Sequence, residues 1–192
     1  AAGGPGAHRS PSGITVTFQH AQPECYDLVL VAEGAGSSTR KLVLPNAVQR
    51  RPLDVYMGYF TIPKGDGDGE IARWYNAPGG RSVFLRPDRK GTTRAVLTIQ
   101  QKSQGYEDLG LAEQKRVLRE RFADAKWETP RVLEGLASSE DLYFEFLNQV
   151  KMAHWSSGRV AFIGDAAWCA TPLAGLGTTL AITGAYVLAG EL

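Results

Sequence analysis

Residues 159–179 read RVAFIGDAAWCATPLAGLGTT, and this stretch decides the fold. It begins with a short run of Val, Ala, Phe and Ile, which is typical of a strand buried on both faces of a parallel sheet. Asp165 comes directly after this strand, at the kind of position where open α/β sheets bind ligands. A carboxylate there could accept hydrogen bonds from sugar hydroxyls. The alternative is that Asp165 caps the turn that follows.

The same stretch continues into a predicted apolar helix over residues 176–192. Glycines at 175 and 177 open this helix, and they would let a ligand approach the backbone N–H groups closely. The amino terminus of a helix favours an electron-rich or anionic group. The simpler interpretation is that these glycines bind no ligand and only allow the start of the helix to pack tightly.

A second buried strand is predicted at residues 27–32 (DLVLVA), and it ends at a glycine-rich turn over 33–38. Gly34 and Gly36 imitate a dinucleotide-binding fingerprint. Thr39 stands where that motif has its third glycine, which permits close packing of helix on strand. We therefore do not expect a complete nucleotide-binding unit at this turn.

Between these two stretches the pattern changes to half-buried strands and amphipathic helices, which indicates an antiparallel sheet with helices. The glycine- and aspartate-rich run 65–69 (GDGDG) lacks the spacing of a calcium loop and is predicted to be a mobile hairpin tip. Thr129 is the expected N-cap of the second helix. The elements predicted in this block are strands at 55–62, 71–76, 81–86, 93–101 and 141–150 and helices at 111–123 and 130–137.

Composition excludes several classes of protein. The 192 residues are 43% hydrophobic and 21% charged, with a formal net charge of +1, so binding to nucleic acid or to a membrane surface through bulk charge is not expected. The two cysteines, Cys25 and Cys169, have neither disulfide-framework nor zinc-site spacing. No apolar run is long enough to span a bilayer. These features favour a soluble protein of a reducing compartment, the cytoplasm, without a metal site.

Taken together and in this order, the two stretches resemble the FAD-dependent aromatic hydroxylases, a family of monooxygenases similar to para-hydroxybenzoate hydroxylase that includes the tetracycline-inactivating enzymes. Residues 27–40 resemble the family's DG motif, and residues 159–181 resemble its GD motif and flavin-contacting helix. The resemblance implies a mixed α/β fold. A partial Rossmann-like FAD-binding domain, residues 1–50 and 151–192, would carry an inserted antiparallel-sheet substrate domain, residues 51–150.

The resemblance also implies a chemistry. FAD would be the cofactor, NAD(P)H the co-substrate, and O₂ would hydroxylate an aromatic or polyketide-like small molecule. Asp165 would bind a flavin ribityl or ribose hydroxyl, and the backbone at 175–177 would approach the N1–C2=O edge of the ring. No catalytic residue is assigned. The cofactor-binding residues implied are Glu33, Gly34, Arg40, Gly164, Asp165, Pro172, Gly175, Leu176 and Gly177.

The sequence departs from the family pattern in three ways. No G-x-G-x-x-G unit precedes Ile14, Glu33 replaces the family's aspartate, and Trp168 stands where His or Tyr is common. We interpret the chain as a fragment that binds FAD weakly or not at all by itself. An exposed apolar sheet edge is then expected, with a risk of self-association. The alternatives are an inactive remnant, or a flavin halogenase or reductase on the same fold.

Substrate contacts are harder to assign from sequence. Five side chains on the predicted covering sheet could face a pocket, although ordinary sheet packing is the simpler explanation for each. Cys169 is expected to be a small buried filler. The five candidates are Met57, Tyr59, Arg73, Phe84 and Arg86.

Overall fold

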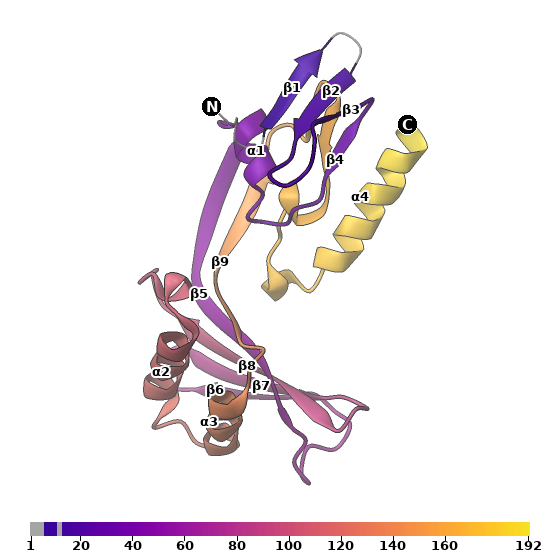
Figure 1. Ribbon diagram of the computed structural model, residues 1–192. Coiled ribbons are helices and arrows are strands. Elements are labelled where there is room, and N and C mark those ends of the chain that lie inside the picture. Colours follow the sequence, from indigo (N-terminus) through magenta and orange to yellow (C-terminus); the bar gives the residue numbers. More distant parts are fainter. Residues whose placement is uncertain (1–5, 11–12) are drawn as a thin grey trace. The chain divides into compact units, whose positions relative to one another are not determined.

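The computed structural model describes residues 6–10 and 13–192, of which residues 6–10 are described by their backbone alone. The chain divides into two compact units, the first formed by Ala1–Arg51 with Asn148–Leu192 and the second by Pro52–Leu147. Each unit has its own sheet and its own apolar core. The mixed α/β class predicted from the sequence is confirmed (Figure 1).

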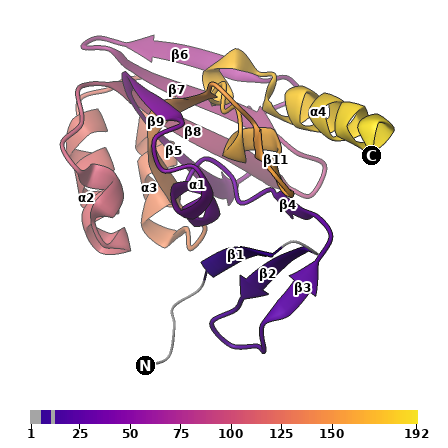
Figure 2. The same cartoon turned by 90° about the horizontal axis from the view of Figure 1, so that it is seen from above.

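The first unit contains two small sheets. One is an antiparallel meander of β1, β2 and β3 (Figure 2). The other has the order β10-β11-β4, and its strands β4 and β11 pair in parallel, Val31 opposite Phe162. The parallel pair predicted from the two apolar runs is therefore present. The strands are β1 (Gly6–Ser10), β2 (Gly13–Thr17), β3 (Glu24–Tyr26), β4 (Val29–Val31), β10 (Ser156–Ser157) and β11 (Val160–Phe162).

The two strands of the parallel pair differ in burial. All three residues of β11 are buried, as predicted, whereas Leu30 in β4 is 47% exposed. The prediction that β4 is buried on both faces is therefore wrong, because β4 lies at the edge of its sheet and nothing described covers that side of Leu30. The exposed apolar edge is present. Self-association through it stays a prediction.

Helices follow both strands of this pair. Helix α1 (Ser38–Val43) follows β4, and α4 (Gly177–Glu191) follows two 3-10 turns, Gly164–Ala166 and Pro172–Ala174. No described residue of α4 is buried. The core of this unit is instead made by the strands and the first turn, with Ile14, Val31, Val160, Phe162, Ala166 and Ala167 at its centre.

The second unit is built on a five-stranded sheet of order β6-β7-β8-β5-β9. Helices α2 and α3 lie beside each other on one face of this sheet (Figures 1 and 2). Alternation along β5 sends Tyr56, Phe60 and Ile62 into the core beneath the helices, because successive strand residues point to opposite faces. The elements are β5 (Val48–Pro63), β6 (Arg73–Ala77), β7 (Arg81–Pro87), β8 (Thr92–Gln100), α2 (Leu111–Phe122), α3 (Thr129–Ser138) and β9 (Tyr143–Met152).

The segment 65–69 is not the mobile hairpin tip that its composition suggested. Strands β5 and β6 are not neighbours, so this segment belongs to a crossover between them. Asp68 is only 1% exposed, and its carboxylate accepts hydrogen bonds from Gly65 N at 2.9 Å and Thr93 Oγ1 at 2.6 Å. The acidic run is thus bound to the body of the second unit.

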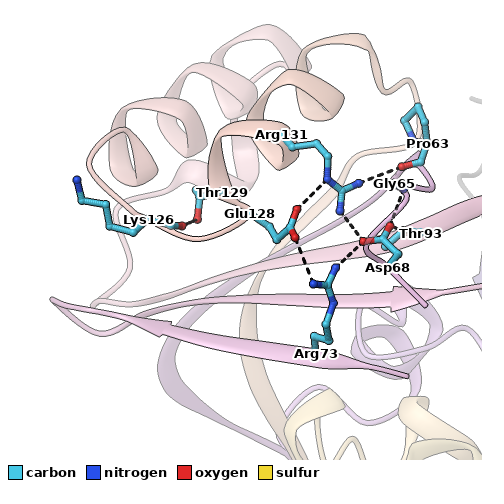
Figure 3. A network of polar contacts seen from close by, with 9 residues as sticks. All are labelled: Pro63, Gly65, Asp68, Arg73, Thr93, Lys126, Glu128, Thr129 and Arg131. Atoms are coloured by element: carbon cyan, nitrogen blue, oxygen red, sulfur yellow. Dashed lines mark hydrogen bonds and ion pairs between the residues drawn. The ribbon is translucent and has the colours of Figure 1, made fainter. Parts of the chain in front are cut away.

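Two arginines complete this arrangement, which we call the Asp68 network. Arg73 and Arg131 each place an Nη2 atom 2.6 Å from Asp68 Oδ1. Glu128 pairs with both arginines, at 3.2 and 3.0 Å, so positive and negative groups alternate (Figure 3). The network joins the crossover to β6 and to the start of α3.

The two helices of this unit lie within one residue of their predicted bounds, although the N-cap expected for the second was wrong. Leu111 begins α2 and is 46% exposed, and the buried residues of this helix begin at Gln114. Thr129 is not the N-cap of α3. It lies inside the helix, and its hydroxyl donates to the carbonyl of Lys126.

Candidate functional site

A cleft of about 630 Å³ opens where β4 and β11 end. Because these strands are parallel, the residues that follow them reach the same edge of the sheet. Six of the nine cofactor residues predicted from the sequence line this cleft. Its lining residues are Ala32, Gly34, Ile163, Gly164, Asp165, Thr171, Pro172, Gly175, Gly177, Thr178 and Ala181.

Glycine is required at three of these positions by backbone conformation. Gly34, Gly164 and Gly175 have φ of +78°, +57° and +65°, the left-handed region that L side chains rarely adopt. A side chain at Gly34 or Gly175 would meet no atom within 4 Å, which leaves the backbone open to a ligand. The turns after both strands therefore present bare backbone to the cleft.

The backbone N–H groups around the start of α4 differ in whether they already have an acceptor. Gly175 N already donates to Pro172 O at 3.0 Å, which closes the 3-10 turn before α4. The first hydrogen bond of the α4 ladder is Leu180 N to Leu176 O at 2.9 Å. The N–H groups of Gly177 and Thr178 precede it and have no acceptor within the helix. Leu176 is the N-cap residue, is 52% exposed, and is not among the lining residues.

Asp165 is exposed and carries the single charge of the lining. Within the part of the chain that the structure describes, no group donates a hydrogen bond to its carboxylate, so the alternative of a turn cap finds no support. Of the described residues that line the cleft, none is Lys, Arg or His. The cleft therefore offers an acceptor carboxylate and helix N–H donors, but no cation.

Glu33 lies outside the cleft and holds the turn before α1. Its Oε2 accepts from Ser37 Oγ at 2.7 Å and Thr39 N at 3.0 Å, and its Oε1 accepts from Thr39 Oγ1 at 2.6 Å. Burial alone would raise the pKa of Glu33, but these hydrogen bonds from Thr39 and Ser37 lower it below its ordinary value. Glu33 lines a separate groove of about 590 Å³ between β2, β4 and α1.

Arg40 lies in the interior of the first unit and is 1% exposed. Its Nη2 donates to Ala35 O and its Nη1 to Ala166 O, each at 2.6 Å. Burial and the neighbouring charge of Arg50 lower its pKa, and the guanidinium stays charged at neutral pH. Arg40 thus joins the turn after β4 to the turn after β11. The structure does not bring it into the cleft.

Sequence reasoning missed Thr171 and Thr178, which both line the cleft. Both lie within the stretch that resembles the GD motif, but no role was assigned to either, and Thr171 differs from an ordinary loop residue in its backbone conformation and its buried hydroxyl. Cys169 is 8% exposed, in agreement with the expected buried filler.

The second unit has its own pocket, of about 280 Å³, on the sheet face opposite the helices. Three of the five substrate candidates line it, namely Tyr59, Phe84 and Arg86. Met57 packs with Val96 and Leu147 in a small apolar cluster. Arg73 belongs to the Asp68 network and does not line this pocket.

Two absences hold for the described residues. Nowhere in ranges 6–10 and 13–192 do three or more His, Cys, Asp or Glu side chains gather as metal ligands. No helix in those ranges is both long and apolar enough to cross a bilayer.

A cleft at the carboxyl ends of parallel strands, beside a helix amino terminus, defines a cofactor-binding α/β protein. The model of the FAD binding domain family matches residues 26–192, and the chain belongs to this family. The resemblance to FAD-dependent aromatic hydroxylases that the sequence motifs suggested is thereby confirmed.

Individual relatives agree with this family. A flavin-dependent monooxygenase of Legionella longbeachae is 37% identical over 96% of this chain and 48% of its own length. Monooxygenase CTB7 of Cercospora beticola is 39% identical over 89% of this chain and 43% of its own. The crystal structure of tetracycline destructase Tet(55) matches with a TM-score of 0.86 and 32% identity, over 98% of this chain and 51% of that one. The chain thus spans about half the length of the curated relatives it matches.

Proposed function

We propose that this chain forms the flavin-ring side of the cofactor site of an FAD-dependent monooxygenase, together with the inserted substrate domain. NAD(P)H would be the reductant and O₂ the oxidant. The observation that carries the proposal is the cleft, because the residues of both family motifs line one cavity although they lie far apart in sequence. We also propose a cytoplasmic location, from the cysteine usage.

The residues of the cleft fit the flavin part of FAD. Bare glycine backbone at 34 and 175 leaves room for a flat ring. The exposed Asp165 carboxylate can accept hydrogen bonds from ribityl or ribose hydroxyls. The N–H groups of Gly177 and Thr178 can stabilise negative charge on the ring, since the positive end of the α4 dipole lies there. FAD, when bound, supplies the redox chemistry.

The proposed substrate is an aromatic or polycyclic polyketide-like compound. Tetracycline destructases Tet(51) and Tet(55) are 31% and 32% identical to this chain, which supports that class. The pocket in the second unit suits an aromatic substrate, because Tyr59, Phe84 and Tyr143 line it.

The test is a titration of the isotope-labelled chain with FAD, followed by two-dimensional amide NMR, which detects weak as well as tight binding. We expect shifts at Gly34, at Gly164–Asp165 and at 171–178. Asp165→Asn should weaken FAD binding about tenfold or more, because a hydrogen bond to a charged group contributes about 1.5–3 kcal/mol. Asp27→Asn, at an exposed position of the same unit, should leave it unchanged. Wild-type spectra that stay the same up to millimolar FAD would refute the proposal.

A further inference from the structure

Thr171 has a backbone conformation that is almost confined to glycine. Its φ is +71° and its ψ is +159°. A β-branched side chain is strained in this region, where glycine alone is commonly found. Among the described residues, two other non-glycine residues have positive φ, Asp54 and Trp127, and neither lines the cleft. Such strain persists only where the surrounding structure imposes it.

The side chain of Thr171 is unusual as well. The residue is 5% exposed, and its hydroxyl Oγ1 is buried with no hydrogen-bond partner in the described part of the chain. Buried polar groups nearly always find a partner, since leaving one unsatisfied is costly. The same residue lines the cleft. Two independent costs therefore meet at one residue of the cleft lining.

The character of the cleft limits what this ligand group can be. The lining contains the Asp165 carboxylate and no cation among its described residues, so a phosphate is disfavoured beside Thr171. A hydroxyl both donates and accepts a hydrogen bond. The group that suits it is neutral and carries donors and acceptors on one edge, as the pyrimidine edge of a flavin ring does.

We propose that the Thr171 hydroxyl hydrogen-bonds the polar edge of the bound flavin ring, and that the loop 171–175 keeps its strained backbone to hold the hydroxyl there. This inference rests on the proposed function, because it needs a flavin in the cleft. It assigns Thr171 a ligand contact that was not expected from its place in the GD-motif stretch. It also makes the loop less stable without flavin than it would be with another residue at this position.

The test compares Thr171→Val and Thr171→Ser in the full chain, with Thr183→Val on the exposed surface of α4 as the control. Flavin affinity is followed by amide NMR, and the thermal midpoint is measured without ligand. Thr171→Val keeps the shape and removes the unsatisfied hydroxyl. It should raise the ligand-free midpoint and weaken flavin binding about three- to tenfold, the worth of one neutral hydrogen bond. Thr171→Ser should keep the wild-type affinity, and Thr183→Val should change neither quantity.

Three results would overturn the inference. If Thr171→Val binds flavin as the wild type does, the hydroxyl makes no contact, although the proposed function stands. If Thr171→Val lowers the midpoint and Thr171→Ser loses affinity equally, Thr171 has a structural role only. If the wild-type chain shows no flavin-dependent shifts, the proposed function and this inference both fail.

Discussion

Replacing Asp68 by asparagine should destabilise the second unit strongly, although the two side chains have the same shape. Asp68 is 1% exposed and receives two arginines and two neutral donors. Asparagine removes the negative charge and leaves Arg73 and Arg131 to share Glu128 (Figure 3). Two positive groups would then lie close together with half of their counter-charge gone.

The magnitude follows from burial. Breaking a buried ion pair by removing one partner costs about 3–5 kcal/mol. The arginine side chains here are 23% and 30% exposed, so water recovers part of this cost. We expect a loss of about 2–3 kcal/mol in the free energy of unfolding. For a unit of this size the thermal midpoint should fall by roughly 10–20 °C.

The effect should depend on pH in one direction. Burial alone would raise the pKa of Asp68, but hydrogen bonds from Thr93 and Gly65 and the charge of Arg131 lower it below its ordinary value. A carboxylate whose pKa is lowered by folding stabilises the native state above its unfolded pKa, about 3.9. That stability is lost as the pH falls through the folded pKa. The difference between wild type and Asp68→Asn should therefore be constant near neutrality and shrink below about pH 4.

The assay is equilibrium unfolding in denaturant, with amide hydrogen exchange read by mass spectrometry in residues 52–147. Asp66→Asn is the matched control, because Asp66 is an exposed aspartate of the same acidic run. Equal stability of Asp68→Asn and Asp66→Asn at neutral pH would refute the reasoning. A difference that persists unchanged in acid would refute the assignment of the effect to the Asp68 charge.

Two further substitutions test the packing of each unit. Gly135→Ala should cost about 1–3 kcal/mol by overpacking, since the new Cβ would lie 2.3 Å from Ile62 Cγ2 beneath α3. Gly110→Ala, where a Cβ meets nothing within 4 Å, is its control in thermal unfolding, and equal midpoints would contradict the close approach. Arg40→Met should cost about 1–3 kcal/mol in the first unit, because it leaves the carbonyl of Ala166 without its donor and the carbonyl of Ala35 with Arg50 alone. The control is Lys41→Met, on the exposed side of α1, which should leave stability nearly unchanged. If amide exchange at residues 164–167 does not become faster in Arg40→Met, the hydrogen bond from Arg40 to Ala166 does not stabilise this turn.

The sequence predicted the elements that follow a repeating pattern. The β-branched and aromatic content of the middle block indicated its strands, and the two apolar runs indicated the strands of the parallel pair. The turn glycines were recognised through their motifs, and Gly34, Gly164 and Gly175 do occupy positions where L side chains are strained. Both kinds of signal are local, so a single stretch of sequence contains them.

What could not be predicted depends on contacts between distant residues. Asp68 lies in a run that looks like a solvated loop, and nothing near it in the sequence indicates its ion pair with Arg131. Arg40 was assigned to the cofactor from its place in a motif, but its side chain turns inward to Ala166, which is 126 residues away. Thr171 was assigned no role, because its side chain gives no sign in the sequence of the left-handed backbone that it adopts before the 3-10 turn.

The hydrogen bond from Arg40 to the carbonyl of Ala166 has a consequence for the order of folding. The two turns that form the cleft are brought together only when the long intervening chain has closed, and loop closure costs more entropy as the loop lengthens. The second unit, in which β6, β7 and β8 pair in sequence order, can shorten this loop by folding first. The cleft at the ends of β4 and β11 then forms after the second unit. A destabilising substitution in the second unit would therefore delay formation of the cleft, although it changes no residue of the cleft.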